Sequence, residues 1–244
     1  MKEKENIIFG KHSLNSALRN QVTINKVWLS ESLKGIDNLI NELKNNQIPY
    51  KFIKKSKLDE IAGNTNHQGY VAEITNKKFT DIQDIIEKSK YKDIFIVILD
   101  GIKDPHNLGA IIRTSVCAGV DAIIIPKYRA VGITGTVAKT SAGTLNDIDI
   151  CRVTNISQTI NLLKKNNIWV VGLDINSKFI YTEANLKGNI ALVIGSEGEG
   201  ISKIVKESCD FTIKIPMKNN VNSLNASVAS AIIVYEVFKQ RNFK

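Results

Sequence analysis

The stretch Thr212–Phe238, TIKIPMKNNVNSLNASVASAIIVYEVF, joins a strand, a polar loop and a helix, and the rest of the chain is organised around it. An alternating apolar run ends at Pro216, and from Ala226 onward apolar residues recur at helical spacing. Short polar side chains at a helix start either cap its unpaired backbone N–H groups or hold a ligand, and capping is the more common role. The residues in question are Ser223, Asn225 and Ser227.

Six strongly apolar runs, with helical segments between them, fill the chain from Ile94 onward. Continuous apolar strands that alternate with helices are typical of a parallel sheet covered on both faces. Ligands of such sheets bind beyond the carboxyl ends of the strands, so the chemistry is expected just after these runs. The sequence therefore predicts an α/β fold. The runs are IFIVIL, DAIIIP, DIDICRV, IWVVGL, IALVIG and DFTIKIP.

A polar motif, DGIKDPHNLGAIIRT, follows the first run. Asn107 is predicted to start and cap a helix, and Gly109 to allow close packing. Arg113 lies in an otherwise apolar helix, where a buried or half-buried arginine is expected to have an anionic partner. A substrate phosphate and the internal carboxylate of Glu197 are the two candidates.

A glycine-rich turn, GSEGEGIS from Gly195 to Ser202, follows the fifth run. Its glycines let the backbone approach a ligand, but it lacks the GxxxxGK[ST] phosphate-binding pattern, and no GxGxxG fingerprint follows the first strand. Glu197 argues against a phosphate ligand and for one with hydroxyls or positive charge. Because all three polar loops follow strands of one predicted sheet, we expect them to line one crevice.

Residues 1–75 predict a small α/β unit, 76–93 a charged linker with an amphipathic turn or two, and 94–244 the main domain. A lysine cluster at the end of a short strand indicates either RNA-backbone binding or a solvated lysine face, and the charges alone do not separate the two. The cluster consists of Lys51, Lys54, Lys55 and Lys57. The predicted helices are His12–Arg19, Ile36–Asn45 and Lys57–Ala62, and the predicted strands are Ile24–Leu29, Tyr50–Ile53 and Gly69–Ile74.

The 244-residue chain carries a net charge of +9, which favours a polyanionic partner without identifying one. The beginning of the sequence has no apolar signal segment, and no apolar run is long enough to span a membrane, so a cytoplasmic location is expected. The three cysteines lie far apart and are interpreted as buried apolar residues. No His, Cys or acidic residues have metal-ligand spacing, and no metal site is predicted.

The three motifs NLGAIIRT, VIGSEGEGIS and IPMKNNVNSLNASVASAI resemble, in order and spacing, those of the SpoU (TrmH-like) family of RNA ribose 2′-O-methyltransferases in the SPOUT superfamily. The resemblance extends over nearly all of the domain from Ile94. The front part, from FGKHSLNSAL to HQGYVAEI, resembles the substrate-binding domain of RlmB-type members, which methylate a guanosine ribose in large-subunit ribosomal RNA. This second resemblance favours RNA as the partner of the lysine cluster.

The resemblance implies properties that spacing alone does not show. It implies a parallel sheet with a C-terminal trefoil knot, although physical arguments alone disfavour knots. It implies a homodimer, and S-adenosylmethionine as a cofactor held bent in the knot. The positions that match the family's cofactor-binding residues are Gly195, Ile215, Leu224 and Asn225.

The family's catalytic motif positions match Arg113, Asn107, Glu197, Ser223 and Asn225. Arg113 is the proposed base in the family, but a guanidinium is a poor proton acceptor near neutral pH. We therefore expect Arg113 to orient an RNA phosphate beside the 2′-hydroxyl. Asn107 and Asn225 are expected to orient Arg113 and the ribose, Glu197 and Ser223 to brace the loops, and two subunits to share one site.

Three alternatives remain at this stage. The substrate could be transfer RNA, and the protein could be a non-catalytic RNA-binding protein of the same fold, although it would then not need Arg113, Glu197 and Asn225 together. A nucleotide-dependent enzyme that uses the glycine-rich turn is the third, and that turn lacks a phosphate-binding lysine.

Overall fold

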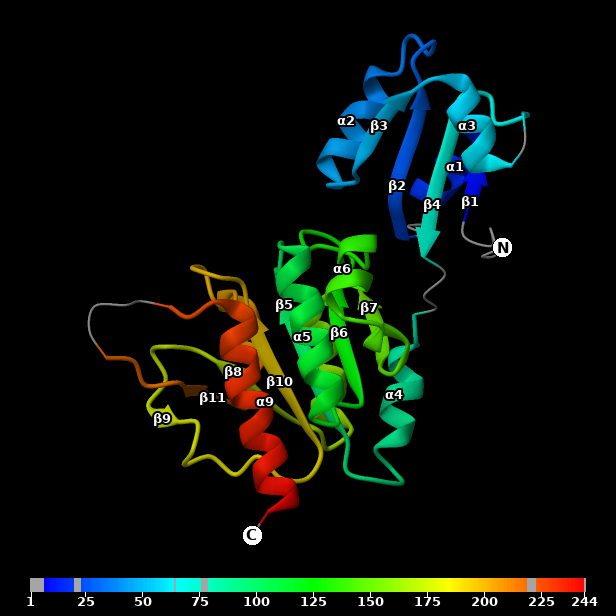
Figure 1. The fold of residues 1–244 in the computed structure, drawn as a ribbon. Helices are drawn as coiled ribbons and strands as arrows, with labels where there is room; N and C mark the ends of the chain where they lie inside the picture. The colour runs from blue at the N-terminus through cyan, green and yellow to red at the C-terminus, as the bar shows by residue number, and fades with distance from the viewer. Residues whose placement is uncertain (1–6, 20–22, 64, 76–78, 219–222, 244) are drawn as a thin grey trace. The chain divides into compact units, whose positions relative to one another are not determined.

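The computed structural model of this protein describes residues 7–19, 23–63, 65–75, 79–218 and 223–243. The chain divides into two compact units, one of Met1–Lys77 with Ile133–Val137 and the other of Lys78–Gly132 with Ala138–Lys244. Figure 1 colours them from blue to cyan and from green to red, apart from the short segment Ile133–Val137. Each unit is built around its own sheet.

The first unit is a four-stranded sheet in the order β1-β4-β2-β3, with three helices. Strand β2 pairs in parallel with β3 and antiparallel with β4. A buried cluster that includes Leu14, Val27 and Leu43 joins α1 and α2 to the sheet. The elements are β1 (Ile7–Phe9), α1 (Lys11–Arg19), β2 (Thr23–Ser30), α2 (Asp37–Asn45), β3 (Tyr50–Ile53), α3 (Lys55–Ala62) and β4 (Tyr70–Thr75).

The sequence predicted all these elements except β1. That strand is only three residues long and pairs antiparallel with β4 at the edge of the sheet. A run this short carries too little alternation to distinguish it from a loop, so its pairing comes from tertiary structure. The four lysines of the predicted cluster at Lys51–Lys57 are all exposed, and Phe52 among them is 41% exposed.

The second unit contains a seven-stranded parallel sheet in the order β7-β6-β5-β10-β8-β11-β9. The α/β parallel architecture predicted from the six apolar runs is confirmed, and the two-residue strand β9 was missed. From residue 79 onward the elements in chain order are α4 (Ile82–Lys88), β5 (Phe95–Asp100), α5 (Pro105–Cys117), β6 (Ala122–Pro126), α6 (Gly135–Thr140), a 3-10 turn (Thr144–Asn146), β7 (Asp149–Val153), α7 (Ile156–Lys165), β8 (Trp169–Leu173), β9 (Phe179–Ile180), β10 (Ile190–Gly195), α8 (Lys203–Ser208), β11 (Phe211–Lys214) and α9 (Ala226–Asn242).

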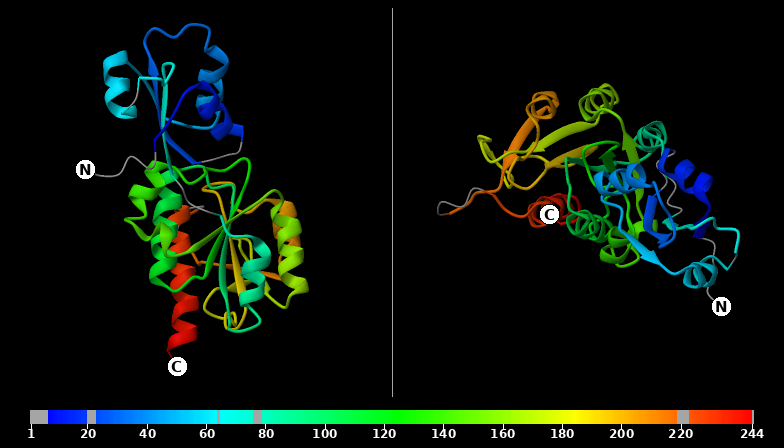
Figure 2. Two further views of the ribbon diagram at one scale, coloured as in Figure 1. Left: turned by 90° about the vertical axis from the view of Figure 1, so that its right-hand side faces the viewer. Right: turned by 90° about the horizontal axis from the view of Figure 1, so that it is seen from above.

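Both faces of this sheet are covered, which explains why its central strands are continuously apolar. Ile96 and Ile98 of β5 belong to a buried cluster with residues of α4, α7 and α8. Phe95, the neighbour of Ile96 in β5, faces the opposite side of the sheet. There the guanidinium of Arg241 in α9 lies 5.2 Å from the centre of the Phe95 ring. Helices α5 and α9 pack side by side on that face (Figure 2).

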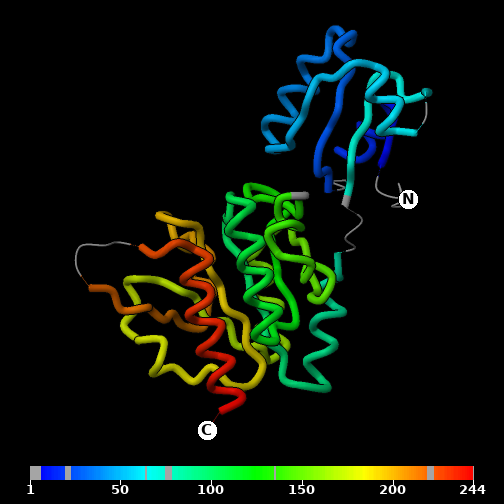
Figure 3. The backbone as a smooth tube through the Cα atoms, viewed as in Figure 1, coloured from blue at the N-terminus to red at the C-terminus, as the bar shows by residue number. Residues whose placement is uncertain are grey.

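The strand order brings distant loops to one edge of the sheet. Strand β10 lies between β5 and β8, although the chain reaches it only after β6, β7, β8 and β9, a path that can be followed in Figure 3. The carboxyl ends of β5 and β10 are paired directly, Asp100 with Gly195. The trefoil knot does not follow from strand order and stays a prediction.

The segment interpreted from sequence as a linker contains α4, which packs into the second unit. Ile85 and Ile86 of this helix are 1% and 3% exposed in the core, and the Thr80 hydroxyl donates to Asp149 over 2.9 Å. The amphipathic turn therefore has a definite packing partner.

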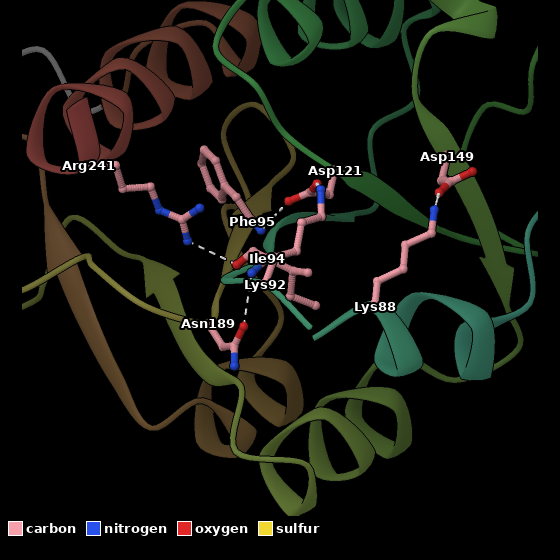
Figure 4. A network of polar contacts seen from close by, with 8 residues as sticks. All are labelled: Lys88, Lys92, Ile94, Phe95, Asp121, Asp149, Asn189 and Arg241. Carbon is pink, nitrogen blue, oxygen red and sulfur yellow. Dashed lines mark hydrogen bonds and ion pairs between the residues drawn. The ribbon is translucent and has the colours of Figure 1, made fainter. Parts of the chain in front are cut away.

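A polar network closes the amino edge of the sheet (Figure 4). Arg241 donates to the carbonyl oxygen of Ile94 over 2.9 Å and also to that of Gly188. Asn189 Oδ1 and Asp121 Oδ2 accept from the backbone N–H groups of Ile94 and Phe95, at 2.9 and 2.8 Å. Arg241 is half-buried; this burial lowers the pKa of its guanidinium, and the carboxylates of Asp121 and Asp93 oppose the shift.

The cysteines differ in exposure. Cys151 is buried and Cys209 partly buried, and burial raises the pKa of Cys151 to about 11 and that of Cys209 to about 12. Cys117 is exposed near the end of α5, so the prediction that all three are buried is wrong for this residue. Among the described residues, no three His, Cys, Asp or Glu side chains gather as metal ligands. In the same part of the chain, no helix is both long and apolar enough to cross a membrane.

Candidate active site

Three loops at the carboxyl edge of the second sheet meet at the side chain of Asn225. Its Nδ2 atom donates to Oδ1 of Asn107 over 3.0 Å and to Oε2 of Glu197 over 3.3 Å. These residues belong to the motifs that follow β5 and β10, whereas Asn225 follows β11. The expectation from sequence that the three polar loops converge therefore has a direct geometric basis.

The same side chain caps α9. Asn225 Oδ1 accepts from the backbone N–H groups of Ser227 and Val228, at 2.9 and 3.4 Å, and from the Ser227 hydroxyl at 2.6 Å. Capping requires the oxygen at this position, so the amide nitrogen must be the end that faces Asn107 and Glu197. Helix capping and the joining of the motifs are two roles of one residue.

The prediction that Asn107 starts and caps its helix is wrong. Helix α5 begins two residues earlier, at Pro105, and its cap is Asp104, whose Oδ1 accepts from the His106 N–H over 3.0 Å. Proline suits the first helical position because its φ angle is already helical and it has no N–H to satisfy. Asn107 therefore does not cap the helix, and its Oδ1 accepts a hydrogen bond from the Asn225 amide nitrogen.

The expectation that Arg113 is buried or half-buried is also wrong, because its side chain is exposed. Helix α5 packs through Leu108, Ile111 and Ile112, and Arg113 falls outside this face. Within the described part of the chain, Arg113 makes no hydrogen bond or ion pair, so Glu197 is not its partner and Asn107 does not orient it. The single chain thus leaves this guanidinium available to another molecule.

The glycine-rich turn after β10 is closed on itself. Ser196 and Gly200 exchange backbone hydrogen bonds of 3.2 and 2.9 Å, and a Cβ atom on Gly195 would lie 1.9 Å from the carbonyl carbon of Gly200. No side chain fits at Gly195 without moving that backbone. Asp100 Oδ2 accepts from the Ser202 N–H over 2.8 Å and holds the exit of the turn.

A cavity of about 270 Å³ lies beside this turn, at the carboxyl ends of β8, β10 and β11. Of the residues predicted to bind a cofactor, Gly195, Ile215 and Leu224 line it, together with Ser223. Asn225 does not line it but stands between two residues that do, Leu224 and Ala226. Glu197, Asn107 and Arg113 are not in its wall.

The chemistry of the wall suits a ligand that has an apolar ring and polar or cationic groups. Ile194, Ile215 and Leu224 supply apolar surface, and Asp174 and Glu199 supply carboxylates. None of the described residues that line the cavity is lysine or arginine. This composition disfavours a phosphorylated ligand and fits S-adenosylmethionine, which combines an adenine ring, ribose hydroxyls, an ammonium group and a sulfonium.

Sequence reasoning missed the contribution of β8 to the cavity. Asp174, Ile175 and Asn176 follow this strand and line the wall, and Asp174 also forms an ion pair with Lys206. The run IWVVGL was recognised as a strand, so the rule that ligands bind beyond carboxyl ends applied here too. The short polar stretch after it lacks glycines and gave no separate signal.

Comparison with known families covers both units. Residues 94–235 match the model of the SpoU rRNA Methylase family, and residues 7–80 match the model described as RNA 2′-O ribose methyltransferase substrate binding. The chain is 42% identical over 240 residues to a putative TrmH family tRNA/rRNA methyltransferase of Staphylococcus haemolyticus (97% of this chain, 96% of the other). A protein of the same description from Staphylococcus aureus strain COL is 42% identical over 243 residues and is covered to 98%, as is this chain.

Solved structures share the fold at lower identity. The SpoU methyltransferase AviRb of Streptomyces viridochromogenes, in complex with AdoMet, has a TM-score of 0.62 at 21% identity, over 96% of this chain and 89% of that one. The AdoMet-bound rRNA methyltransferase of Sinorhizobium meliloti gives a TM-score of 0.62 at 20% identity, over 98% and 88%. The family matches along the sequence therefore show that the chain is a member of the SpoU rRNA Methylase family, a TrmH-like RNA methyltransferase.

Proposed function

We propose that this protein transfers a methyl group from S-adenosylmethionine to a ribose 2′-hydroxyl of RNA. The observation that carries the proposal is the pair of hydrogen bonds from Asn225 to Asn107 and Glu197, immediately beside the cavity lined by Gly195, Ile215 and Leu224. The residues of all three family motifs thus surround one place at the edge of the sheet.

The residues that line the cavity would hold S-adenosylmethionine, which would supply a methyl group on a sulfonium. Transfer of that group to the 2′-oxygen would leave the neutral thioether S-adenosylhomocysteine and release the hydroxyl proton to solvent. The chain's own residues position the reactants, which is a large source of rate in such a transfer. Glu197 holds Asn225 by accepting its amide N–H, and Asn225 holds Asn107. The Asn107 amide nitrogen has no acceptor among the described residues, and in this proposal it donates to the ribose.

Arg113 orients an RNA phosphate beside the 2′-hydroxyl, in a site that two subunits share. Its exposure and its lack of an internal partner support this role, because an arginine fork suits phosphate geometry. Val228 and Tyr235 of the neighbouring helix α9 are 48% and 47% exposed, with Ile232 between them on the same side. This apolar stripe is suited to a second copy of the chain, and we propose that the protein is a homodimer.

The first unit binds the RNA substrate, and a guanosine of large-subunit ribosomal RNA is the proposed target. Support comes from the match of residues 7–80 to a substrate-binding family model and from the four exposed lysines at Lys51–Lys57 beside exposed Phe52. The proposed division is an RNA-binding domain at 1–75, a connecting segment at 76–93 whose helix α4 packs into the second unit, and a knotted methyltransferase domain at 94–244. Such a protein would act in the cytoplasm.

Calorimetric titration of the full-length protein with S-adenosylmethionine, ATP and NAD tests the cofactor. Saturable binding of S-adenosylmethionine alone is expected, because the cavity wall has two carboxylates and no basic residue among those described. Binding of ATP or NAD in its place would favour a nucleotide-dependent enzyme. S-adenosylmethionine binding without methylation of ribosomal or transfer RNA would favour a non-catalytic RNA-binding protein.

A further inference from the structure

A short loop after β6, Lys127–Ala130, is fixed at both ends and projects between them. The Lys127 N–H donates to the carbonyl oxygen of Val153, and the Val131 N–H donates to that of Ile102, each over 2.8 Å. Val131 and Ile102 are themselves buried, at 9% and 3% exposure. The loop is therefore held by the sheet and by the segment that leads into α5.

The projecting part presents an aromatic and a cationic side chain. Tyr128 is 58% exposed, and the Lys127 ammonium lies 5.6 Å from the centre of its ring. Arg129 is exposed and has a φ angle of 61°, in the left-handed region that costs a non-glycine residue free energy. Glycine would adopt this conformation without strain.

The position of the loop relates it to the candidate active site. It leaves the carboxyl end of β6, which pairs with β5, and the Asp100 motif leaves the carboxyl end of β5. Ile102, to which the loop is hydrogen-bonded, is followed by Lys103. The Lys103 side chain is 65% exposed, and its ammonium lies 4.0 Å from a Glu199 carboxylate oxygen. Lys127 and Arg129 make the loop itself basic, since Lys127–Val131 contains no acidic residue.

We propose that Tyr128 and Arg129 form an RNA-binding platform of the methyltransferase domain, in which Tyr128 stacks on an unpaired base near the methylated nucleotide and Arg129 binds a backbone phosphate. Single-stranded RNA is recognised through base stacking on exposed aromatic rings flanked by positive charge, and this loop supplies both. A rigid loop presents the ring at low entropic cost. The inference rests on the proposed function, because it assigns the platform to the RNA that is methylated.

The test uses the full-length protein, tritiated S-adenosylmethionine and in vitro transcribed large-subunit ribosomal RNA. The variants are Tyr128→Ala, Tyr128→Leu and Tyr128→Phe, with Arg129→Gly and Arg129→Lys. Tyr91→Ala is the matched control, because Tyr91 is 82% exposed but precedes β5 and so belongs to the opposite edge of the sheet. Each variant is assayed for the KM of RNA, for kcat, for S-adenosylmethionine affinity and for oligomeric state by gel filtration.

Tyr128→Ala and Tyr128→Leu are expected to raise the RNA KM by about tenfold, the effect of losing one stacked base. Tyr128→Phe should be close to wild type, since the ring remains. Arg129→Gly should raise the RNA KM while thermal stability is kept or increased, because glycine relieves the strain. Arg129→Lys should restore part of the RNA affinity. Cofactor affinity should not change in any of them.

Equal KM values for wild type, Tyr128→Ala and Arg129→Gly would overturn the platform while leaving methyl transfer intact. Loss of the dimer in Tyr128→Ala would instead assign the loop to a subunit interface and would also overturn it. If the wild-type protein binds S-adenosylmethionine but methylates neither ribosomal nor transfer RNA, the proposed function itself has failed, and the two failures are thereby distinguished.

Discussion

Asn225 donates a hydrogen bond to Asn107 over 3.0 Å, although the two residues are 118 positions apart in the sequence. The parallel sheet makes this contact possible, because β5, β10 and β11 all end at the same edge. The bond connects the cap of α9 to the first turn of α5.

Asn225→Asp is expected to reduce methyl transfer strongly while the fold is retained. The aspartate still caps α9 through its oxygen, but it loses the donor to Asn107 and places a carboxylate against Glu197. The misplacement should lower kcat by about a hundredfold. Steady-state methylation assays with thermal unfolding provide the measurement. Asn155→Asp, at the cap of the remote helix α7, is the control and should remain active; full activity of Asn225→Asp would contradict the assignment.

Gly195→Ala is expected to eliminate binding of S-adenosylmethionine. The added methyl group would overlap the Gly200 backbone at 1.9 Å and displace the turn that forms one wall of the cavity. Calorimetry and circular dichroism would measure cofactor affinity and folding. Gly132→Ala is a suitable control because a Cβ there meets no atom within 4 Å. Unchanged affinity in Gly195→Ala would show that the turn is not part of the binding site.

Arg241→Ala is expected to reduce the free energy of unfolding by about 2 kcal/mol, because it removes the donor to the carbonyl oxygens of buried Ile94 and of half-buried Gly188. Urea denaturation measures the loss. Lys239→Ala, in the same helix turn but 66% exposed in its ion pair with Glu236, should change stability by less than about 0.5 kcal/mol. Equal effects of the two substitutions would argue against the network shown in Figure 4.

Mixing two inactive variants tests whether Arg113 serves the partner's site. A dimer of one Arg113→Ala subunit and one Asn225→Asp subunit keeps one complete site if Arg113 acts across the interface, and none if it acts within its own chain. If subunits of the two variants, mixed in equal amounts, exchange at random, about half of the two-fold dimers are mixed. Each mixed dimer has one complete site of two, so up to about a quarter of wild-type activity should be restored. The assay is methylation after co-refolding, with each variant refolded alone as control. No recovery in a mixture shown to form mixed dimers would place Arg113 in its own subunit's site.

The sequence was informative where a pattern is local. The apolar runs predicted the six main strands of the second sheet, since strands buried on both faces need no alternation. It was uninformative for β1 and β9, whose three and two residues are ordered by pairing with neighbours. The start of α5 was misplaced because the sequence contains two possible caps, Asp104 and Asn107, and the helix begins at Pro105 with Asp104 as its cap.

For the candidate site, the motifs identified Asn107, Glu197 and Asn225, and the structure joins them. The sequence did not reveal the exposure of Arg113, because the residues around it are apolar or small and do not show which face packs against the sheet. The contribution of Asp174 and Asn176 was missed for a related reason: their role depends on β8 being placed beside β10, which only tertiary structure determines.

The most direct test of the central claim is the chemical position of the transferred methyl group. Wild-type protein and Arg113→Ala are incubated with tritiated S-adenosylmethionine and ribosomal RNA, and the product is hydrolysed in alkali. The account predicts label in alkali-resistant dinucleotides for wild type, since a 2′-O-methyl group blocks cleavage, and no label for Arg113→Ala despite normal cofactor binding. Label released as mononucleotides, or equal labelling by both proteins, would contradict it.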